Sequence, residues 1–332
     1  MNNCNFKISV VIPAFNEEGN ITILTEKLLE ILENYGNYEI LFVDDGSKDN
    51  TLNVLRDLIK KNNNIRYISL SRNFGHQNAL KAGLDHAKGD CVITMDGDMQ
   101  HPPELIPEMV EKWLDGYDIV YTLRDDDNET SWLKRKTSNL FYRLMNRISD
   151  VHVEKGAADF RLLDSSVVDV LKEVKEYYLF FRGLTSWAGF RQIALHYKPN
   201  KRHSGETKYS IRRMIGFALT GITSFSLKPL RLSILLGTFF AFLAFLYGIY
   251  AIIMKFFTNQ ALPGWASVLV SVLFIGGFQL IVLGIIGEYI GKMFMESKHR
   301  PHYIIKEKAG AGVEEFEGEL RRQFFKNPKT NE

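Results

Sequence analysis

The sequence predicts an α/β domain with a Rossmann-like parallel sheet, followed by a region with two transmembrane helices. Short apolar segments alternate with amphipathic helical segments over residues 7–121. This alternation is typical of a parallel sheet with helices on both faces. Two almost wholly apolar runs follow at residues 232–254 and 265–286. Each run is long enough to cross a hydrocarbon core of about 30 Å, so the pair predicts a transmembrane hairpin.

The predicted strands are short and mostly apolar, and the predicted helices have apolar residues on one face. Strands are expected at residues 7–12, 38–43, 65–70, 92–95 and 118–121. Helices are expected at residues 51–61, 77–87 and 103–115, with an earlier one that ends near residue 35. In such sheets the carboxyl ends of the strands lie along one edge, where ligands bind. The polar residues that follow each strand should therefore gather at that edge.

The residues that follow the fourth predicted strand carry the clearest chemical pattern. Asp96, Asp98 and Gln100 alternate directly after a buried apolar run. In extended or turning backbone their side-chain oxygens can converge on one point. Oxygen ligands suit a hard divalent ion such as Mg²⁺ or Mn²⁺, which keeps open positions for phosphate oxygens. An isolated Asp-x-Asp also occurs by chance or as a helix cap, so the pattern needs support from the rest of the chain.

Composition and motifs argue against several classes of function. The net charge of +2 is no signature of nucleic-acid binding. Cys4 and Cys91 form neither a disulfide framework nor a zinc spacing. The sequence contains no G-x-G-x-x-G after the first strand and no G-x-x-x-x-G-K-[ST], which argues against a dehydrogenase and a P-loop NTPase. The acidic pair Asp44 and Asp45 after the second strand either contacts ribose or a base, or forms a solvated turn.

Charge around the apolar runs predicts the orientation in the membrane. Cations flank the hairpin on both sides, whereas the connecting loop has one, Lys255; the flanking cations are Arg212, Arg213, Lys228, Arg231, Lys292, Lys298 and Arg300. The positive-inside rule then places both ends in the cytoplasm, with no signal peptide before the first strand. We expect four regions: a cytosolic domain (1–209), interfacial amphipathic helices (210–231), the transmembrane hairpin (232–300) and a charged cytosolic tail (301–332).

Three further segments carry charge near the expected site. The amphipathic segment 132–148 includes Lys134 and Arg135, and presents either a solvated basic face or a site for an anion near the membrane. The basic segment 202–209 contains a glycine, and such a loop can close over phosphates. Asp159 and Arg161 are two residues apart near a strand end, so they form a salt bridge or point into the site.

Five motifs occur in the order seen in glycosyltransferase family 2. They are Val10–Glu18, Val43–Ser47, Asp96–Gln100, Ala158–Arg161 and Gly205–Tyr209. The chain resembles this family, and most closely its polyprenyl-phosphate branch of bactoprenol glucosyltransferases and dolichyl-phosphate mannose synthases. The resemblance covers about residues 6–300, and five ordered motifs are specific where each alone is weak. Two departures are Phe15, where relatives often have tyrosine, and Thr207, where serine is common.

The resemblance implies a GT-A fold and an inverting, metal-dependent transfer of a hexose from a nucleotide-sugar to polyprenyl phosphate. It implies a role in binding the nucleotide-sugar for Pro13, Phe15, Glu17, Asp44, Asp45, Asp96 and Arg161. It implies a divalent metal, Mg²⁺ or Mn²⁺, held by Asp96, Asp98 and Gln100. Catalytic roles fall to Asp98, Asp159, Arg202 and Lys208, with the last two reaching the diphosphate or the acceptor phosphate.

The acceptor chemistry adds a second set of candidates. A phosphate monoester is largely ionised near neutral pH, so it attacks without a strong general base. Its difficulty is the approach of one anion to another, and Arg124, Lys134 and Arg135 are our candidates for holding the acceptor phosphate. Asp159 occupies the place of the family's proposed catalytic carboxylate. Its role stays open between orienting Arg161, contacting the sugar and accepting a residual proton.

Several alternatives remain at this stage. UDP-glucose is the preferred donor, and GDP-mannose and UDP-N-acetylhexosamines stay open. A processive polysaccharide synthase usually carries Q-x-x-R-W, which Phe181-Arg182-Gly183 does not match. A catalytically silent membrane scaffold and a soluble transferase are less favoured, because the metal motif and both apolar runs are intact. The expected location is the bacterial inner or plasma membrane, with a homo-oligomer left open through the glycines at 276, 277, 284 and 287.

Overall fold

The computed structural model describes residues 6–125, 154, 156–198, 226–258 and 264–310. These residues fall into two compact units. One unit contains the sheet and its helices, and it includes residues 300–310 from beyond the hairpin. The other unit contains two long helices within residues 211–299.

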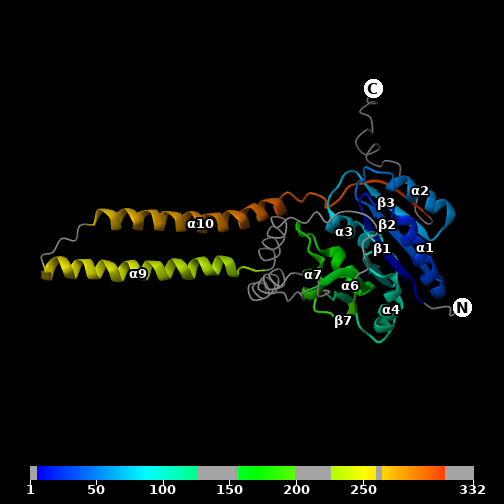
Figure 1. Cartoon of the computed structure of the whole chain (residues 1–332), viewed down its shortest axis with the longest axis horizontal. Helices are drawn as coiled ribbons and strands as arrows, with labels where there is room; N and C mark the ends of the chain where they lie inside the picture. The colour runs from blue at the N-terminus through cyan, green and yellow to red at the C-terminus, as the bar shows by residue number, and fades with distance from the viewer. Residues whose placement is uncertain (1–5, 126–153, 155, 199–225, 259–263, 311–332) are drawn as a thin grey trace, which may run out of the picture. The chain divides into compact units, whose positions relative to one another are not determined.

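The sheet unit is built on eight strands in the order β7-β5-β6-β4-β1-β2-β3-β8. Figure 1 shows β1, β2 and β3 of this sheet side by side. The strands are β1 Ile8–Ala14, β2 Tyr38–Asp44, β3 Ile65–Leu70, β4 Cys91–Thr94, β5 Ile119–Arg124, β6 Ala157–Asp164, β7 Gln192–Tyr197 and β8 Ile305–Gly310. Strands β3, β2, β1 and β4 run parallel, as the alternation predicted. The sheet as a whole is mixed rather than parallel, because β6 runs antiparallel to β4 and β5, and β8 antiparallel to β3.

Helices cover both faces of the sheet. The helical segments of this unit are α1 Ile21–Leu32, η1 Glu33–Tyr35, α2 Thr51–Lys61, α3 His76–His86, η2 Pro103–Leu105, α4 Ile106–Leu114, α6 Ser165–Glu173 and α7 Phe181–Trp187. Ile8, Val10 and Ile12 of β1 pack in one core with the apolar residues of α1 and α4. Val11 points to the opposite face, against Gly83 of α3, where a Cβ atom has no room. Gly83 therefore lets α3 lie close to the sheet, which positions its first residue at the sheet edge.

The segment after the hairpin differs from the prediction. The charged composition of residues 301–332 predicted a tail, but Ile305–Gly310 forms strand β8 beside β3. The charged Glu307 of this strand accepts hydrogen bonds from Arg56 and from Tyr67. A strand can form here without an apolar stripe, because its charged side chain pairs with side chains of the sheet unit instead of being solvated. The remaining tail residues lie outside the described part of the chain.

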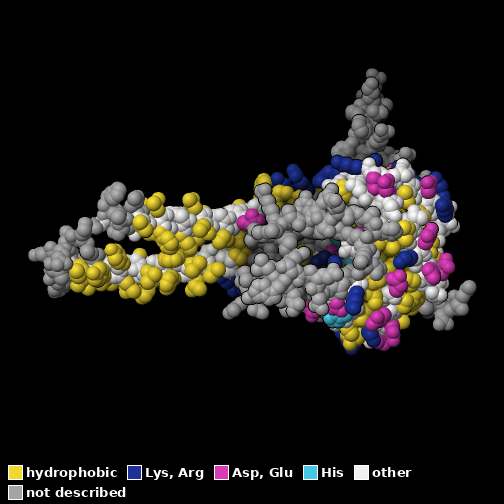
Figure 2. All heavy atoms as spheres, in the orientation of Figure 1, with side chains coloured by type: hydrophobic (Ala, Val, Ile, Leu, Met, Phe, Trp, Pro, Cys, Tyr) yellow, Lys and Arg dark blue, Asp and Glu magenta, His cyan; other side chains and the backbone are white. Residues whose placement is uncertain are grey.

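The second unit consists of α9 Lys228–Thr258 and α10 Trp265–Ser297. Stretches of both, Lys228–Tyr250 and Val270–Ser297, have the length and composition of a membrane span. The rings of Phe274 and Phe278 on α10 contact Phe240 on α9. Figure 2 shows hydrophobic side chains exposed along both helices. The two predicted spans lie within these helices, and α10 continues beyond the second predicted span to Ser297.

Candidate active site

The turn after β4 carries the first group of candidate residues. The Gln100 amide donates to Asp98 Oδ2 over 2.9 Å, and the Gln100 backbone N–H donates to Asp98 Oδ1 over 3.2 Å. Met99 between them has a positive φ of 65°, a conformation uncommon outside glycine. The turn thus brings the side chains of Asp98 and Gln100 together, while the third residue of the predicted set, Asp96, bonds to His76 instead.

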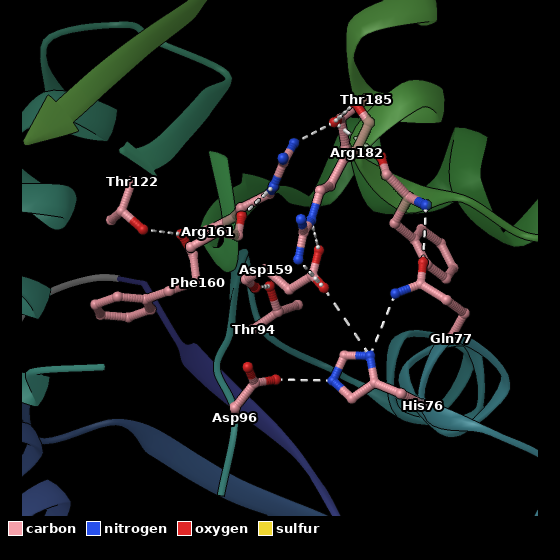
Figure 3. Close-up of polar contacts among 12 residues, drawn as sticks. His76, Gln77, Thr94, Asp96, Thr122, Asp159, Phe160, Arg161, Arg182 and Thr185 are labelled. Atoms are coloured by element: carbon pink, nitrogen blue, oxygen red, sulfur yellow. Dashed lines mark hydrogen bonds and ion pairs between the residues drawn. The ribbon is translucent and has the colours of Figure 1, made fainter. Parts of the chain in front are cut away.

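Asp96 lies between two histidines. His76 Nε2 lies 2.7 Å from Asp96 Oδ1 (Figure 3), and His101 Nε2 lies 3.7 Å from Asp96 Oδ2. Burial opposes ionisation of both members of the closer pair. The histidines outweigh burial and lower the pKa of Asp96, while Asp96 and Asp159 raise the pKa of His76 to about 9. The pair is therefore an ionised carboxylate beside an imidazolium at neutral pH.

Asp159 on β6 is held by an arginine from a distant helix. Arg182 on α7 donates through Nε and Nη2 to the two carboxylate oxygens of Asp159, over 2.8 and 2.9 Å. His76 Nδ1 lies 4.0 Å from Asp159 Oδ2. Burial opposes ionisation of Asp159, but Arg182 and His76 hold its pKa well below the ordinary range. Arg182, Asp159, His76 and Asp96 thus form a row of alternating charges, which we call the charge row (Figure 3).

Arg161 does not pair with Asp159. Its guanidinium donates to the Ala158 carbonyl over 3.0 Å and to the Thr185 hydroxyl. Arg161 is buried, and burial lowers its pKa to about 10, although Asp159 opposes this shift. The side chain therefore ties β6 to α7 inside the fold.

The loops after β1, β2 and β3 form the other side of the site. Asp44 accepts hydrogen bonds from the Ser69 hydroxyl and the Ser47 backbone. Asp45 accepts from the backbone N–H groups of Phe74 and Gly75, over 2.7 and 2.9 Å. Both carboxylates are buried, and burial raises the pKa of Asp45. This acidic pair is therefore bonded within the fold and does not form a solvated turn.

The loop after β1 leaves an aromatic ring accessible. Phe15 follows the last residue of β1 and is 40% exposed, so a planar group can stack on it. Pro13 lies within β1, and its carbonyl oxygen is 3.4 Å from the place that a Cβ atom on Gly97 would occupy. Glu17 accepts a hydrogen bond from Asn20 over 2.6 Å. Pro13, Phe15 and Glu17 thus come to the same sheet edge as Gly97.

The donor set after β4 fits a divalent ion by its chemistry. Asp96, Asp98 and Gln100 offer carboxylate and amide oxygens, the ligands that Mg²⁺ and Mn²⁺ prefer. Among the described residues, no three His, Cys, Asp or Glu side chains are grouped to hold a metal. Asp96 is bonded to His76, and the Gln100 amide nitrogen faces Asp98. An ion held by all three side chains would therefore compete with His76 for Asp96 and with the Gln100 amide for Asp98.

One of the predicted cations lies beside this turn. Arg124 is the last residue of β5, and its Nη1 lies 3.4 Å from Gln100 Oε1. A candidate for the acceptor phosphate is thus adjacent to a candidate metal ligand. The other predicted cations, Lys134, Arg135, Arg202 and Lys208, lie outside the described residues.

Three side chains that surround Asp96 and Asp159 were not among the predicted site residues. His76 follows β3 by a short loop, so the rule that strand ends meet at one edge could have found it. His101 stacks on Phe160 with ring centroids 5.3 Å apart, a contact that only the fold creates. Arg182 lies in an aromatic-rich segment, and no local pattern there signals a partner for Asp159.

Two sequence-family models match the chain. The model described as Glycosyl transferase family 2 matches residues 9–171, which include Asp45, Asp96 and Asp159. The model described as GtrB C-terminal hairpin matches residues 228–293, the region of α9 and α10.

Similar proteins match along nearly the whole chain. An uncharacterized glycosyltransferase of Bacillus subtilis, YkcC, is 41% identical over 92% of this chain and 95% of its own length. The bactoprenol glucosyl transferase of Shigella phage SfV is 44% identical over 90% of this chain and 98% of its own. A prophage bactoprenol glucosyl transferase homolog of Escherichia coli K12 is 43% identical over the same shares. These matches extend through both the sheet unit and the hairpin.

Proposed function

Because the chain belongs to glycosyl transferase family 2, we propose that it transfers glucose from UDP-glucose to the phosphate of a polyprenyl lipid. The observation that carries this proposal is the 44% identity to a bactoprenol glucosyl transferase over 90% of the chain. That similarity covers the site and the hairpin together, whereas a soluble transferase would need only the former. The product would be a polyprenyl-phosphate sugar with inverted configuration at the anomeric carbon.

The site supports binding of the donor at the edge of the sheet. Asp98, Gln100 and Asp96 would hold a divalent ion, which neutralises charge on the diphosphate leaving group when bound. The exposed ring of Phe15 offers a stacking surface for the base. Asp45 fixes the loop at Phe74 and Gly75, so this acidic group shapes the nucleoside pocket. The segment 202–209 would add cations to the diphosphate.

The acceptor needs positioning rather than deprotonation. A phosphate monoester near neutral pH is already an anionic nucleophile. Arg124, beside Gln100, would hold this phosphate together with Lys134 and Arg135. Asp159 is poorly suited to be a general base, because Arg182 keeps its pKa well below the ordinary range. We therefore assign Asp159 an electrostatic and orienting role.

The strand after the hairpin supports a common side for the site and both ends of the spans. The chain passes from the sheet unit into α9 and α10 and returns to the same sheet as β8. A hairpin that crosses the membrane twice meets this condition. Lys228, Arg231, Lys298 and Arg300 lie near the ends of the hairpin, and the positive-inside rule puts such cations in the cytoplasm. The acceptor phosphate would then be used at the cytoplasmic face.

A transfer assay tests the function directly. The full-length protein in bilayer discs is given polyprenyl phosphate, Mg²⁺ or Mn²⁺, and one radiolabelled donor at a time. UDP-glucose, GDP-mannose and UDP-N-acetylglucosamine are compared. We expect label in the lipid fraction with UDP-glucose. Lipid labelling with another donor would overturn the assigned sugar alone, whereas label entering only a polymer or a protein would overturn the lipid acceptor.

A further inference from the structure

We infer that Arg182 is a positioning residue of the transfer reaction, which orients the carboxylate of Asp159 and acts on the substrates only through it. The inference rests on the proposed function, since Asp159 has its role in that reaction. It concerns a residue on α7, a helix outside the five motifs that suggested the family.

The backbone of Asp159 is fixed by the sheet. The Thr94 hydroxyl on β4 donates to the Asp159 carbonyl over 2.6 Å, and the Thr122 hydroxyl on β5 donates to the Phe160 carbonyl over 3.0 Å. The side chain of Asp159 is only 9% exposed. A carboxylate with so little access to water needs a charged partner to stay ionised. The strand thus sets where the carboxyl group lies, but not which way it turns.

The backbone of Arg182 is fixed by contacts from two other elements. The Phe181 backbone N–H donates to the Gln77 side chain of α3 over 3.0 Å. Thr185, one turn along α7, accepts a hydrogen bond from the buried Arg161 of β6. The beginning of α7 is therefore tied to both α3 and β6. Arg182 projects from this tied segment onto Asp159 (Figure 3).

The contact between Arg182 and Asp159 determines the orientation of the carboxylate. Two parallel hydrogen bonds from a planar guanidinium fix the plane of a carboxylate, which a single donor cannot do. His76 of α3 lies on another side of the same carboxylate and bonds to Asp96. Without the two-point contact, Asp159 could turn toward His76 and compete with Asp96 for it. Arg182 thus keeps the Asp159 carboxylate from competing with Asp96 for His76.

Arg182 differs from Asp159 in exposure. Its side chain is 36% exposed, so a solute can reach it. A direct role on a substrate anion and an indirect role through Asp159 therefore predict different results. A double-mutant cycle separates them, because a residue that acts only through its partner loses its effect once the partner is neutralised.

The cycle uses Arg182→Gln, Asp159→Asn and the double variant, with Arg182→Lys as the conservative change. We expect Arg182→Gln to lower kcat by about tenfold to a hundredfold with little change in the donor KM, as for other orienting contacts. The double variant should be no slower than Asp159→Asn alone. Arg182→Lys should recover part of the lost kcat, because lysine keeps the positive charge but cannot donate the two parallel hydrogen bonds.

Controls separate this role from folding. Arg191→Gln is the matched arginine control, since Arg191 lies over the ring of Tyr117 and outside the charge row. If Arg182→Gln fails to fold, Asp159→Asn and the double variant still decide, because both remove the buried negative charge. A further fall in kcat in the double variant, or a raised donor KM, would overturn the inference.

The readout keeps the inference distinct from the proposed function. Turnover is followed as nucleotide released from whichever donor the wild-type protein uses, with and without polyprenyl phosphate. Failure of the wild type to label the lipid overturns the proposed acceptor. The cycle is still read on donor turnover, where additive losses overturn the role of Arg182 and non-additive losses support it.

Discussion

Arg56 and Glu307 are 251 positions apart and form a two-point ion pair in which Arg56 Nη2 lies 2.8 Å from each carboxylate oxygen. Arg56 lies on α2, whereas Glu307 lies on β8, beyond both long helices. Tyr303 adds a second tie by donating to Asp85 at the end of α3 over 2.9 Å. The chain that leaves the hairpin is thus bonded to the sheet unit, which constrains the topology in the membrane.

This constraint predicts accessibility at the two ends of the hairpin. Single cysteines are introduced as Asn259→Cys in the connecting loop and Lys298→Cys at the end of α10, in a Cys4→Ser background. We expect a membrane-impermeant maleimide to label only Asn259→Cys in intact cells, and both positions after lysis. Buried Cys91 serves as the internal unreactive thiol. Labelling of Lys298→Cys in intact cells would contradict a cytoplasmic β8.

Loss of the Arg56–Glu307 pair should weaken the docking of β8 modestly. Glu307→Gln removes the charge but keeps the size of the side chain. Because Arg56 is 43% exposed, we expect a loss of only about 1 kcal/mol in the free energy of unfolding. Limited proteolysis between α10 and β8 should be faster than in the wild type. The neighbouring surface pair is the control, since Asp57→Asn near Lys60 should leave this cleavage rate unchanged.

The proposed metal ligands predict a dependence on divalent ions. Chelation should stop transfer, and Mg²⁺ or Mn²⁺ should restore it. Asp98→Asn should lower kcat/KM by about a hundredfold, because an oxygen ligand becomes a weaker neutral one. The control is Asp169→Asn, an exposed acid on α6 paired with Lys172. Full activity of Asp98→Asn in the presence of a chelator would exclude a role for a metal at this turn.

His76 should report on the occupancy of Asp96. The neighbouring carboxylates raise the pKa of His76 to about 9, so the imidazolium persists at neutral pH and is lost as the pH rises through that value. Mg²⁺ with UDP should lower this pKa, because the ion competes for Asp96 and adds positive charge. The measurement is the NMR titration of selectively labelled histidine, with the resonance assigned by His76→Gln. An unchanged His76 titration on saturation with Mg²⁺ and UDP would contradict metal binding at Asp96.

The buried ion pair of Glu39 and Arg66 should govern stability rather than activity, because it lies at the ends of β2 and β3 opposite the candidate active site. Glu39 is 3% exposed and bonds to Arg66 over 2.6 Å and to the Ser9 hydroxyl over 2.6 Å. Glu39→Gln leaves Arg66 without its anionic partner and should cost about 3–5 kcal/mol of unfolding free energy. Thermal unfolding measures this loss, and Glu30→Gln on the exposed face of α1 is the control.

The pH dependence of this pair follows from the pKa of Glu39. Burial opposes ionisation, but hydrogen bonds from Ser9, Lys88 and Arg66 prevail and lower the pKa in the folded state. The stabilisation is therefore complete above the unfolded pKa and is lost as the pH falls through the folded value. The stability difference between wild type and Glu39→Gln should shrink on acidification. A difference that grows toward low pH would contradict the ionised pair.

Local sequence determined the first five strands and the helices between them. Strand β3 and helix α2 have the predicted bounds, since apolar spacing and polar flanks are local properties. The alternation after a buried strand also predicted that polar side chains gather in the turn after β4, where Asp98 and Gln100 are in contact. The length and composition of the two apolar runs predicted the long helices α9 and α10.

Only the tertiary structure decided which distant segments meet. Strand β6 enters the sheet antiparallel beside β4, and β8 returns from beyond the hairpin to β3. Both pairings depend on the path of the connecting chain, about which side-chain periodicity carries no information. The same holds for Asp159, for which the sequence left open a salt bridge with Arg161, two residues away, or a position in the site. The fold turns Arg161 toward Thr185 and brings Arg182 of α7 to Asp159, because a strand fixes the face of a side chain but the packed helix supplies its partner.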